Sequence, residues 1–230
     1  MADRPILFSA PMIRALLAGT KTQTRRVIKP RGKHPSLFDG NSSDSYVLDP
    51  GNEDWRQTDI PIKMGDRLWV RETWQGLTFG NYRPTKQEPC EVRYAATDPC
   101  ADLDAEARGY IWRPSIFMPR FASRLTLSVT DVRVERLQDI IEADAIAEGI
   151  ERAPYGNWKC YGETPKPFGG AAPTVLAHGM GTVSANPFHS YATLWDSING
   201  PGAWDANPWI VAYGFTVHHG NVDQIAQVAA

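Results

Sequence analysis

Residues 120–134 read RFASRLTLSVTDVRV, and this stretch indicates the kind of fold that the chain adopts. Side chains on one face are apolar: Phe121, Leu125, Leu127 and Val129. Those on the other face are polar: Arg124, Thr126, Ser128 and Thr130. A period of two residues is typical of a half-buried β-strand, because successive side chains point to opposite faces of a sheet. We therefore expect a strand over 120–134.

Other stretches predict further strands and a few helices. The expected strands are 5–9, 64–74, 91–97 and 208–217. The expected helices are 11–18, 137–149 and 187–198. We expect strands near 66–73, 91–97, 120–134 and 208–217 to join one sheet. Strands dominate without a repeated strand–helix–strand pattern, so the sequence predicts an α+β fold with a curled or closed sheet and flanking helices.

Two of the expected helices carry recognisable signals. Helix 11–18 has Pro11 in its first turn and is followed by Gly19, which tolerates the left-handed conformation that ends a helix. Helix 137–149 has an apolar stripe made of Ile140, Ala143, Ala147 and Ile150.

Two stretches rich in Gly, Pro and polar residues interrupt this pattern, at 30–60 and 151–186. We interpret them as loop-rich insertions with little regular structure in a single domain over 1–218. The tail 219–230 has few apolar anchors, and we expect it to be mobile.

Composition narrows the functional classes. The net charge of −2 disfavours a protein that coats duplex DNA. Three cysteines, Cys90, Cys100 and Cys160, form no CxxC pair, which favours a reducing cytoplasm over a disulfide framework. No apolar stretch is long enough for a membrane span. The histidines lack metal-ligand spacing, so we expect neither a metal nor a cofactor.

The densest polar cluster is KTQTRR at 21–26, directly after the expected helix stop. A loop at such a junction can direct several side chains into one cleft. The alternative is a solvated basic edge strand, and the composition leaves both open.

Four stretches together resemble the ASCH family in the family's own order. They are LLAGTKTQTRR at 16–26, GDRLWVRET at 65–73, LQDIIEADAIAEGI at 137–150 and PWIVAYGFTV at 208–217. They cover about half of the chain, and the full layout looks most like the longer phage-associated and environmental members. The resemblance implies a PUA-like β-barrel with a cleft beside the first helix.

The resemblance also implies an activity. Some small family members hydrolyse the amide of N4-acetylcytidine with a Lys, a Thr and a Glu, and carry the motif Gly-x-Lys-Thr-x-Thr. Lys21 and Thr24 fall on the matching positions of this chain. The best match for the glutamate is Glu148, although Glu142 and Asp144 are nearby. Thr24 would be the nucleophile, Lys21 its base and Glu148 a proton shuttle.

The chemistry sets conditions on these residues. A lysine acts as a base only if burial or positive charge lowers its pKa, and Arg25 and Arg26 can supply that charge. A carboxylate beside Lys21 would instead raise the lysine's pKa. Lys21 and Thr24 would point to opposite faces of a regular strand, so their pairing needs an irregular backbone after Gly19.

Further candidates could contact a substrate. Trp69, Trp74, Tyr94 and Trp112 could stack on a base or belong to the core. Glu72 shares a strand face with Leu68 and Val70, where a charge needs a partner. We assign substrate binding to Arg25, Arg26, Glu72 and Trp69.

Three functions remain open at this point. The chain could be an amidohydrolase acting on acylated cytidine, a non-catalytic RNA-binding or regulatory module, or a ribonuclease, and fold alone does not choose among them. The net charge favours a small modified nucleoside over long RNA as the partner.

Overall fold

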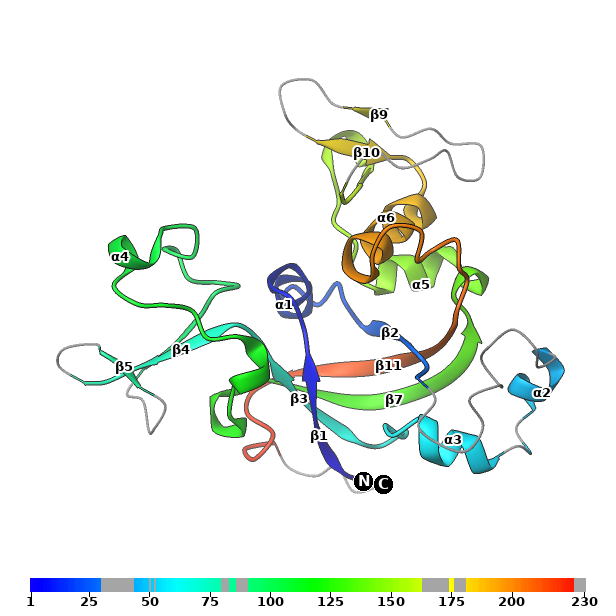
Figure 1. Cartoon of the computed structure of the whole chain (residues 1–230), viewed down its shortest axis with the longest axis horizontal. Helices are drawn as coiled ribbons and strands as arrows, with labels where there is room; N and C mark the ends of the chain where they lie inside the picture. The colour runs from blue at the N-terminus through cyan, green and yellow to red at the C-terminus, as the bar shows by residue number, and fades with distance from the viewer. Residues whose placement is uncertain are drawn as a thin grey trace. The chain divides into compact units, whose positions relative to one another are not determined.

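The computed structural model shows a mixed α+β protein (Figure 1). It describes residues 1–29, 44–49, 51, 53–79, 83–85, 91–162, 174–175 and 181–225. The strands are β1 (Asp3–Leu7), β2 (Gln23–Val27), β3 (Arg67–Arg71), β4 (Trp74–Leu77), β5 (Pro84–Thr85), β6 (Glu91–Tyr94), β7 (Leu125–Arg136), β8 (Trp158–Lys159), β9 (Thr174–Val175), β10 (Thr182–Ser184) and β11 (Trp209–His219). The helices are α1 (Ala10–Leu17), α2 (Asp44–Leu48), α3 (Glu53–Asp59), α4 (Ala105–Arg108), α5 (Glu142–Ala147) and α6 (Pro187–Asn199). The predicted α+β class is confirmed.

The chain divides into two compact units. The first unit comprises Met1–Gly19, Met64–Thr130 and Phe215–Ala230, and the second comprises Thr20–Lys63 and Asp131–Gly214. One boundary between the units lies within β7 and another lies within β11. Each of these strands therefore contributes residues to both units. The single domain over 1–218 stays a prediction.

The largest sheet has the strand order β1-β3-β7-β11-β2. In the first unit β1 runs parallel to β3, and β3 pairs antiparallel with β7. In the second unit β11 pairs antiparallel with β2. The order leaves β1 and β2 at its two ends, so the described strands form an open sheet and no closed barrel.

The strand predicted at 120–134 is confirmed from Leu125 onward and wrong before it, and the predicted polar face is wrong at Thr126, which is fully buried. Leu125, Leu127 and Val129 are buried in β7. Phe121 lies instead in a 3₁₀ turn, Arg120–Ala122, and is 52% exposed. The turn follows Pro119 and uses i→i+3 backbone hydrogen bonds, so this segment does not enter the sheet ladder.

The strand predicted at 91–97 does not join the main sheet. β6 pairs antiparallel with β4 in a separate three-stranded sheet of order β5-β4-β6. The cause lies upstream, because β3 ends at Arg71 and the chain resumes as a new strand at Trp74. β6 therefore pairs with that neighbouring strand, and residues 95–97 form a turn.

A core in the second unit underlies α5, α6 and β11. Its largest buried members include Tyr191, Trp195, Trp204 and Ile210. Figure 1 shows α5 and α6 side by side, as their shared core requires. The helix predicted at 187–198 is confirmed by α6, which begins with Asn186 capping the backbone N–H of Phe188.

The helix predicted at 137–149 is shorter than expected. Leu137–Asp139 form a 3₁₀ turn, and α5 begins at Glu142. Ala145 is buried and Ala143 is exposed, so the predicted apolar stripe is wrong at Ala143. The late start of α5 sets its register, and this register also buries Asp144.

The two insertions contain more regular structure than we expected. α2 and α3 lie within 30–60, where the sequence indicated little regular structure, and the remainder of that stretch is partly outside the described residues. In 151–186, β8, β10 and β9 form a small antiparallel sheet. In the tail, Val222 is fully buried, and 226–230 lie outside the described residues. No helix within the described ranges is both long and apolar enough to cross a membrane.

Candidate functional site

The segment between α1 and β2 leaves regular structure before it reaches α5. Gly19 has a φ of +70°, a value that favours glycine. Lys21 then forms a backbone bridge with Glu148, and the N–H of Thr22 donates to the carbonyl of Ala147 at 2.8 Å. Residues 20–22 therefore lie against the C-terminal end of α5.

The bridge places the Lys21 ammonium directly on Glu148. Nζ donates to the Glu148 carboxylate Oε2 at 2.9 Å and to the Glu148 carbonyl at 2.8 Å. The side chains of Lys21 and Glu148 are 0% and 4% exposed. Burial lowers the pKa of Lys21; Glu148 opposes this shift, and the charges of Arg26 and Arg25 add to it. The lysine thus loses its proton more readily than a lysine in water.

Arg25 holds the other side of Glu148. Its guanidinium donates to Glu148 Oε1 at 3.1 Å, to Asp144 Oδ2 at 2.9 Å and to Glu135 Oε1 at 2.9 Å. The Arg25 side chain is fully buried. We call Lys21, Arg25, Glu135, Asp144 and Glu148 the Lys21 cluster. Arg25 was predicted to contact the substrate. Its contacts instead favour a role in positioning Glu148.

Besides Glu135, the member of the Lys21 cluster to which the sequence assigned no role is Asp144. It accepts hydrogen bonds from Gln23 Nε2 at 2.9 Å and from Arg133 at 3.0 Å. Burial would raise the pKa of Asp144, but those bonds and the charge of Arg25 hold it below its usual value. The available signal was the spacing of Asp144 and Glu148, because residues four apart share a helix face.

Thr24 and Arg26 lie on the other side of β2. In the register with β11, Thr24 is opposite Tyr213 and Arg26 is opposite Val211. Gln23 and Arg25 reach the carboxylates of α5, so the alternation of a strand directs Thr24 and Arg26 to the opposite face. The charge of Arg26 nevertheless lowers the pKa of Lys21, which places Arg26 within electrostatic range of the Lys21 cluster.

The Thr24 hydroxyl is buried and unsatisfied. Thr24 is 1% exposed, and its Oγ1 has no hydrogen-bond partner among the residues that the structure describes. It therefore makes no direct hydrogen bond to Lys21 or Glu148. The structure brings Lys21 and Glu148 into contact. Thr24 is buried with an available hydroxyl, but its hydroxyl is bonded to neither of them.

Glu72 and Trp69 belong to the first unit. Both Glu72 oxygens accept hydrogen bonds from Arg124, at 2.8 and 2.9 Å. The Arg124 guanidinium also stacks on Tyr94 at 4.0 Å. Burial raises the pKa of Glu72, although Arg124 lowers it. Arg124 is thus the partner that a charge at Glu72 requires, and it occupies both carboxylate oxygens. We call this the closed pair, and it favours a structural role for Glu72 instead of the predicted substrate contact.

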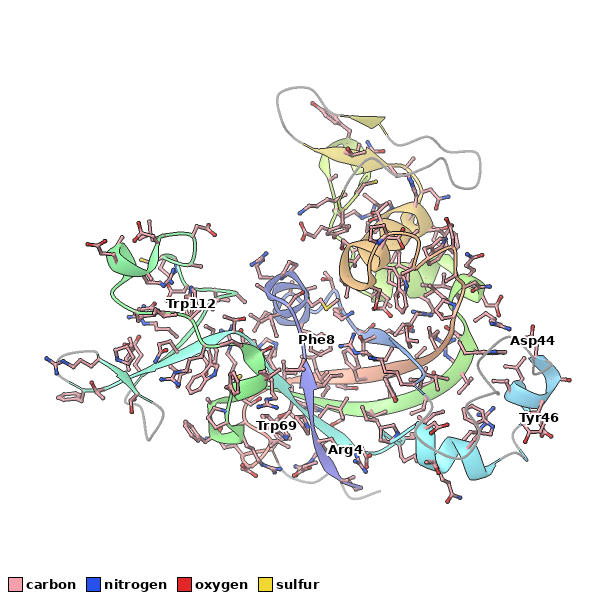
Figure 2. All side chains as sticks on the ribbon, viewed as in Figure 1. Arg4, Phe8, Asp44, Tyr46, Trp69 and Trp112 are labelled. Atoms are coloured by element: carbon pink, nitrogen blue, oxygen red, sulfur yellow. The ribbon has the colours of Figure 1, made fainter. Side chains whose placement is uncertain are left out.

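Trp69, which is labelled in Figure 2, is half-buried in β3. The Arg71 guanidinium stacks on its ring at 5.2 Å. Glu142, a neighbouring carboxylate to Glu148, is exposed. Of the four candidate aromatic side chains, Trp74 is 2% exposed and is a core residue.

The described residues also bear on metal binding and on free thiols. Within the described ranges, no group of three or more His, Cys, Asp or Glu side chains could hold a metal ion. Cys100 and Cys160 are free thiols, and Cys90 and His178 lie outside the described residues.

Comparison of the chain with protein-family models, with curated proteins and with solved structures found no match. The case for a function therefore depends on the residues and their contacts. The Lys21 cluster combines a buried amine with a lowered pKa, a carboxylate fixed on both oxygens, and one arginine, Arg25. Together with the Thr24 hydroxyl, these groups are the ones that acyl transfer requires.

Proposed function

We propose that the chain is an ASCH-type protein with a PUA-like fold that removes the acyl group from N4-acylated cytidine. The observation that carries this proposal is the state of Lys21. Its amine is fully buried, is hydrogen-bonded to Glu148, and has a pKa lowered by burial and by two neighbouring arginines. A lysine whose pKa is lowered can serve as a general base.

The proposed reaction has two halves. In the first, Lys21 takes the proton of Thr24 Oγ1 through bridging water, because the two groups make no direct hydrogen bond, while that oxygen attacks the acyl carbonyl carbon. The bond from the acyl carbon to N4 then breaks, and N4 receives the proton from the Lys21–Glu148 pair. In the second, water attacks the acyl–Thr24 ester, which releases the carboxylic acid and restores the hydroxyl.

The charges of the site suit this sequence of steps. An oxyanion forms on the acyl oxygen in both halves, and Arg26 is the cation on the Thr24 face of β2 that could stabilise it. Arg25 holds Glu148 beside Lys21, so the carboxylate can receive and return a proton without moving.

The alternative is a non-catalytic RNA-binding module in which the Lys21 cluster is structural. The paired state of its charges favours this reading, since buried ion pairs are often only structural. A ribonuclease is the third candidate.

The deciding experiment incubates the purified chain with N4-acetylcytidine and measures cytidine and acetate. We expect both products in equal amounts. RNA affinity without cytidine release would support the binding module, and RNA cleavage without cytidine release would support the ribonuclease. Either result would remove the amidohydrolase proposal.

A further inference from the structure

The first unit contains a pocket of about 970 Å³ that the proposed hydrolysis does not use. Its wall includes Trp74, Gln75, Tyr110, Trp112, Arg113 and Phe117. All residues that line it belong to the first unit, whereas the Lys21 cluster belongs to the second. Small-molecule sites commonly have volumes of about 300–1,000 Å³ and mostly apolar walls with a few polar groups. This aromatic pocket has the size and lining of such a site.

The aromatic rings of the pocket are held in fixed positions. Tyr110 and Trp112 form an edge-to-face pair with ring centroids 5.2 Å apart. The Arg108 guanidinium covers both rings, at 5.4 Å from Tyr110 and 4.9 Å from Trp112. Figure 2 labels Trp112 in this part of the first unit. A planar ligand would meet ring surfaces that are already ordered.

The segment that carries Trp112 is tied to β4. Trp74 and Arg113 exchange backbone hydrogen bonds of 3.2 and 2.8 Å. The Arg113 side chain also donates to the Gln75 carboxamide oxygen at 3.2 Å. The polar groups on this wall are therefore preorganised, which reduces the entropic cost of binding a ligand.

Two residues that line the pocket carry unsatisfied hydrogen-bond donors. Within the described part of the chain, the buried Nε1–H groups of Trp74 and Trp112 have no partner. Trp74 itself is 2% exposed. A buried indole N–H usually has a partner, and it can only donate. A ligand that completes this site must carry acceptors, such as the ring nitrogens or carbonyl oxygens of a heterocycle.

The charges of the lining select against a polyanion. Among the described residues that line the pocket, one is acidic, Glu106, and one is basic, Arg113, while Arg108 lies over the Tyr110 and Trp112 rings. Proteins that bind single-stranded nucleic acid combine stacking rings with a groove of excess positive charge. This lining has the rings without the excess charge, which favours an uncharged small molecule over RNA.

We propose that the aromatic pocket binds an uncharged heteroaromatic molecule of nucleoside size. Its ring stacks on the aromatic wall, and its acceptor atoms receive the indole N–H groups. The proposal goes beyond the hydrolysis assigned to the Lys21 cluster and does not depend on it.

Calorimetric titration of the full chain with adenosine and with guanosine tests the proposal. We expect saturable binding of at least one of the two. Trp112→Leu should weaken it by roughly 5- to 150-fold, the range that corresponds to the loss of one stacked base. Trp112→Phe keeps a ring and removes the N–H, so its loss should be smaller. Phe121→Leu, at a half-exposed aromatic residue outside the pocket, is the matched control and should bind normally.

Lys21→Ala should bind the probe as the wild type does, which separates this site from the hydrolytic one. A thermal melt of each variant shows whether it is folded. The proposal is overturned if the wild type binds neither nucleoside, or if folded Trp112→Leu and Trp112→Phe both bind with wild-type affinity. It is also overturned if a single-stranded oligouridylate binds in the pocket more tightly and with steep salt dependence, since RNA would then be the ligand.

Discussion

Glu72 in the first unit and Glu148 in the second are both buried carboxylates held by arginine, yet their surroundings differ. Arg124 takes both oxygens of Glu72, is itself 24% exposed, and stacks on Tyr94. Glu148 is shared between Lys21 and Arg25, whose side chains are both fully buried. The first arrangement is a single pair with access to water, and the second is a buried network in which Lys21 and Arg25 meet three carboxylates.

This difference indicates which of the two carboxylates, Glu72 or Glu148, belongs to a reactive site. Burial lowers the pKa of Lys21, and the charges of Arg26 and Arg25 add to this shift, although Glu148 opposes it. Glu72 instead forms a one-to-one ion pair with Arg124. We therefore assign catalysis to the Lys21 cluster and stability to the Glu72–Arg124 pair.

The largest expected effect is on catalysis. Lys21→Ala should lower kcat/KM for N4-acetylcytidine by about 10⁴-fold, because the reaction loses its base. The double variant Lys21→Ala/Thr24→Ala should be almost no slower than Lys21→Ala alone, since parts of one catalytic unit fail together. Lys29→Ala, at an exposed lysine, is the control. If the rate losses of Lys21→Ala and Thr24→Ala multiply in the double variant, the two residues do not act as a unit.

The next effect is on stability. Glu148→Gln should lower the free energy of unfolding by about 3–5 kcal/mol, because it leaves the buried Lys21 ammonium without its carboxylate partner. Chemical denaturation measures this loss. Glu142→Gln changes an exposed carboxylate of the same helix and should cost less than about 0.5 kcal/mol. Equal losses in the two variants would contradict the view that Glu148 holds the cluster together.

Arg26 gives a prediction about pH. Its charge lowers the pKa of Lys21, so Arg26→Ala should raise that pKa. The neutral base then appears only at higher pH, and the acid limb of the kcat/KM profile should move upward. If Arg26 stabilises the oxyanion, its loss should also raise the activation free energy by about 3 kcal/mol, so the rate at neutral pH should fall. Arg133→Gln is the control, and an unchanged profile in Arg26→Ala would exclude electrostatic coupling to the base.

The smallest effect is expected at the closed pair. Glu72→Gln should cost about 1–3 kcal/mol of stability, less than Glu148→Gln, because Arg124 can turn toward water. Burial raises the pKa of Glu72 above its usual 4.5, so its protonated form is favoured in the folded state. Wild-type stability should therefore fall as pH rises from about 4.5 through the folded-state pKa. Glu72→Gln should lack this decline in denaturation curves recorded across that range, and its kcat/KM should stay unchanged.

Local patterns predicted much of the fold. Alternation over Leu125–Val129 identified β7, and Pro11 and Gly19 bracketed α1. The patterns failed where strand pairing or helix register depends on residues far away in the sequence. Nothing within residues 91–97 shows that β6 pairs with β4, and a short helix such as α2 has too few turns for a periodic signal.

The candidate site was only partly predictable. Lys21, Thr24 and Glu148 came from the family resemblance, and the contact of Lys21 with Glu148 was implied by no local pattern. Arg25 was identified as a source of positive charge, but its three carboxylate partners come from β7 and α5. Such a convergence of separate segments depends on tertiary packing, which a single sequence does not specify.

The most direct test of the central claim compares two threonines that lie two residues apart. Thr24 is buried with an available hydroxyl, whereas Thr22 is exposed and contributes a backbone N–H. The measurement is the rate of cytidine release from N4-acetylcytidine by folded Thr24→Ala and Thr22→Ala proteins. We predict near-complete loss in Thr24→Ala, partial activity in Thr24→Ser, and a wild-type rate in Thr22→Ala. A wild-type rate in Thr24→Ala would contradict the account and leave a water activated by the Lys21–Glu148 pair as the nucleophile.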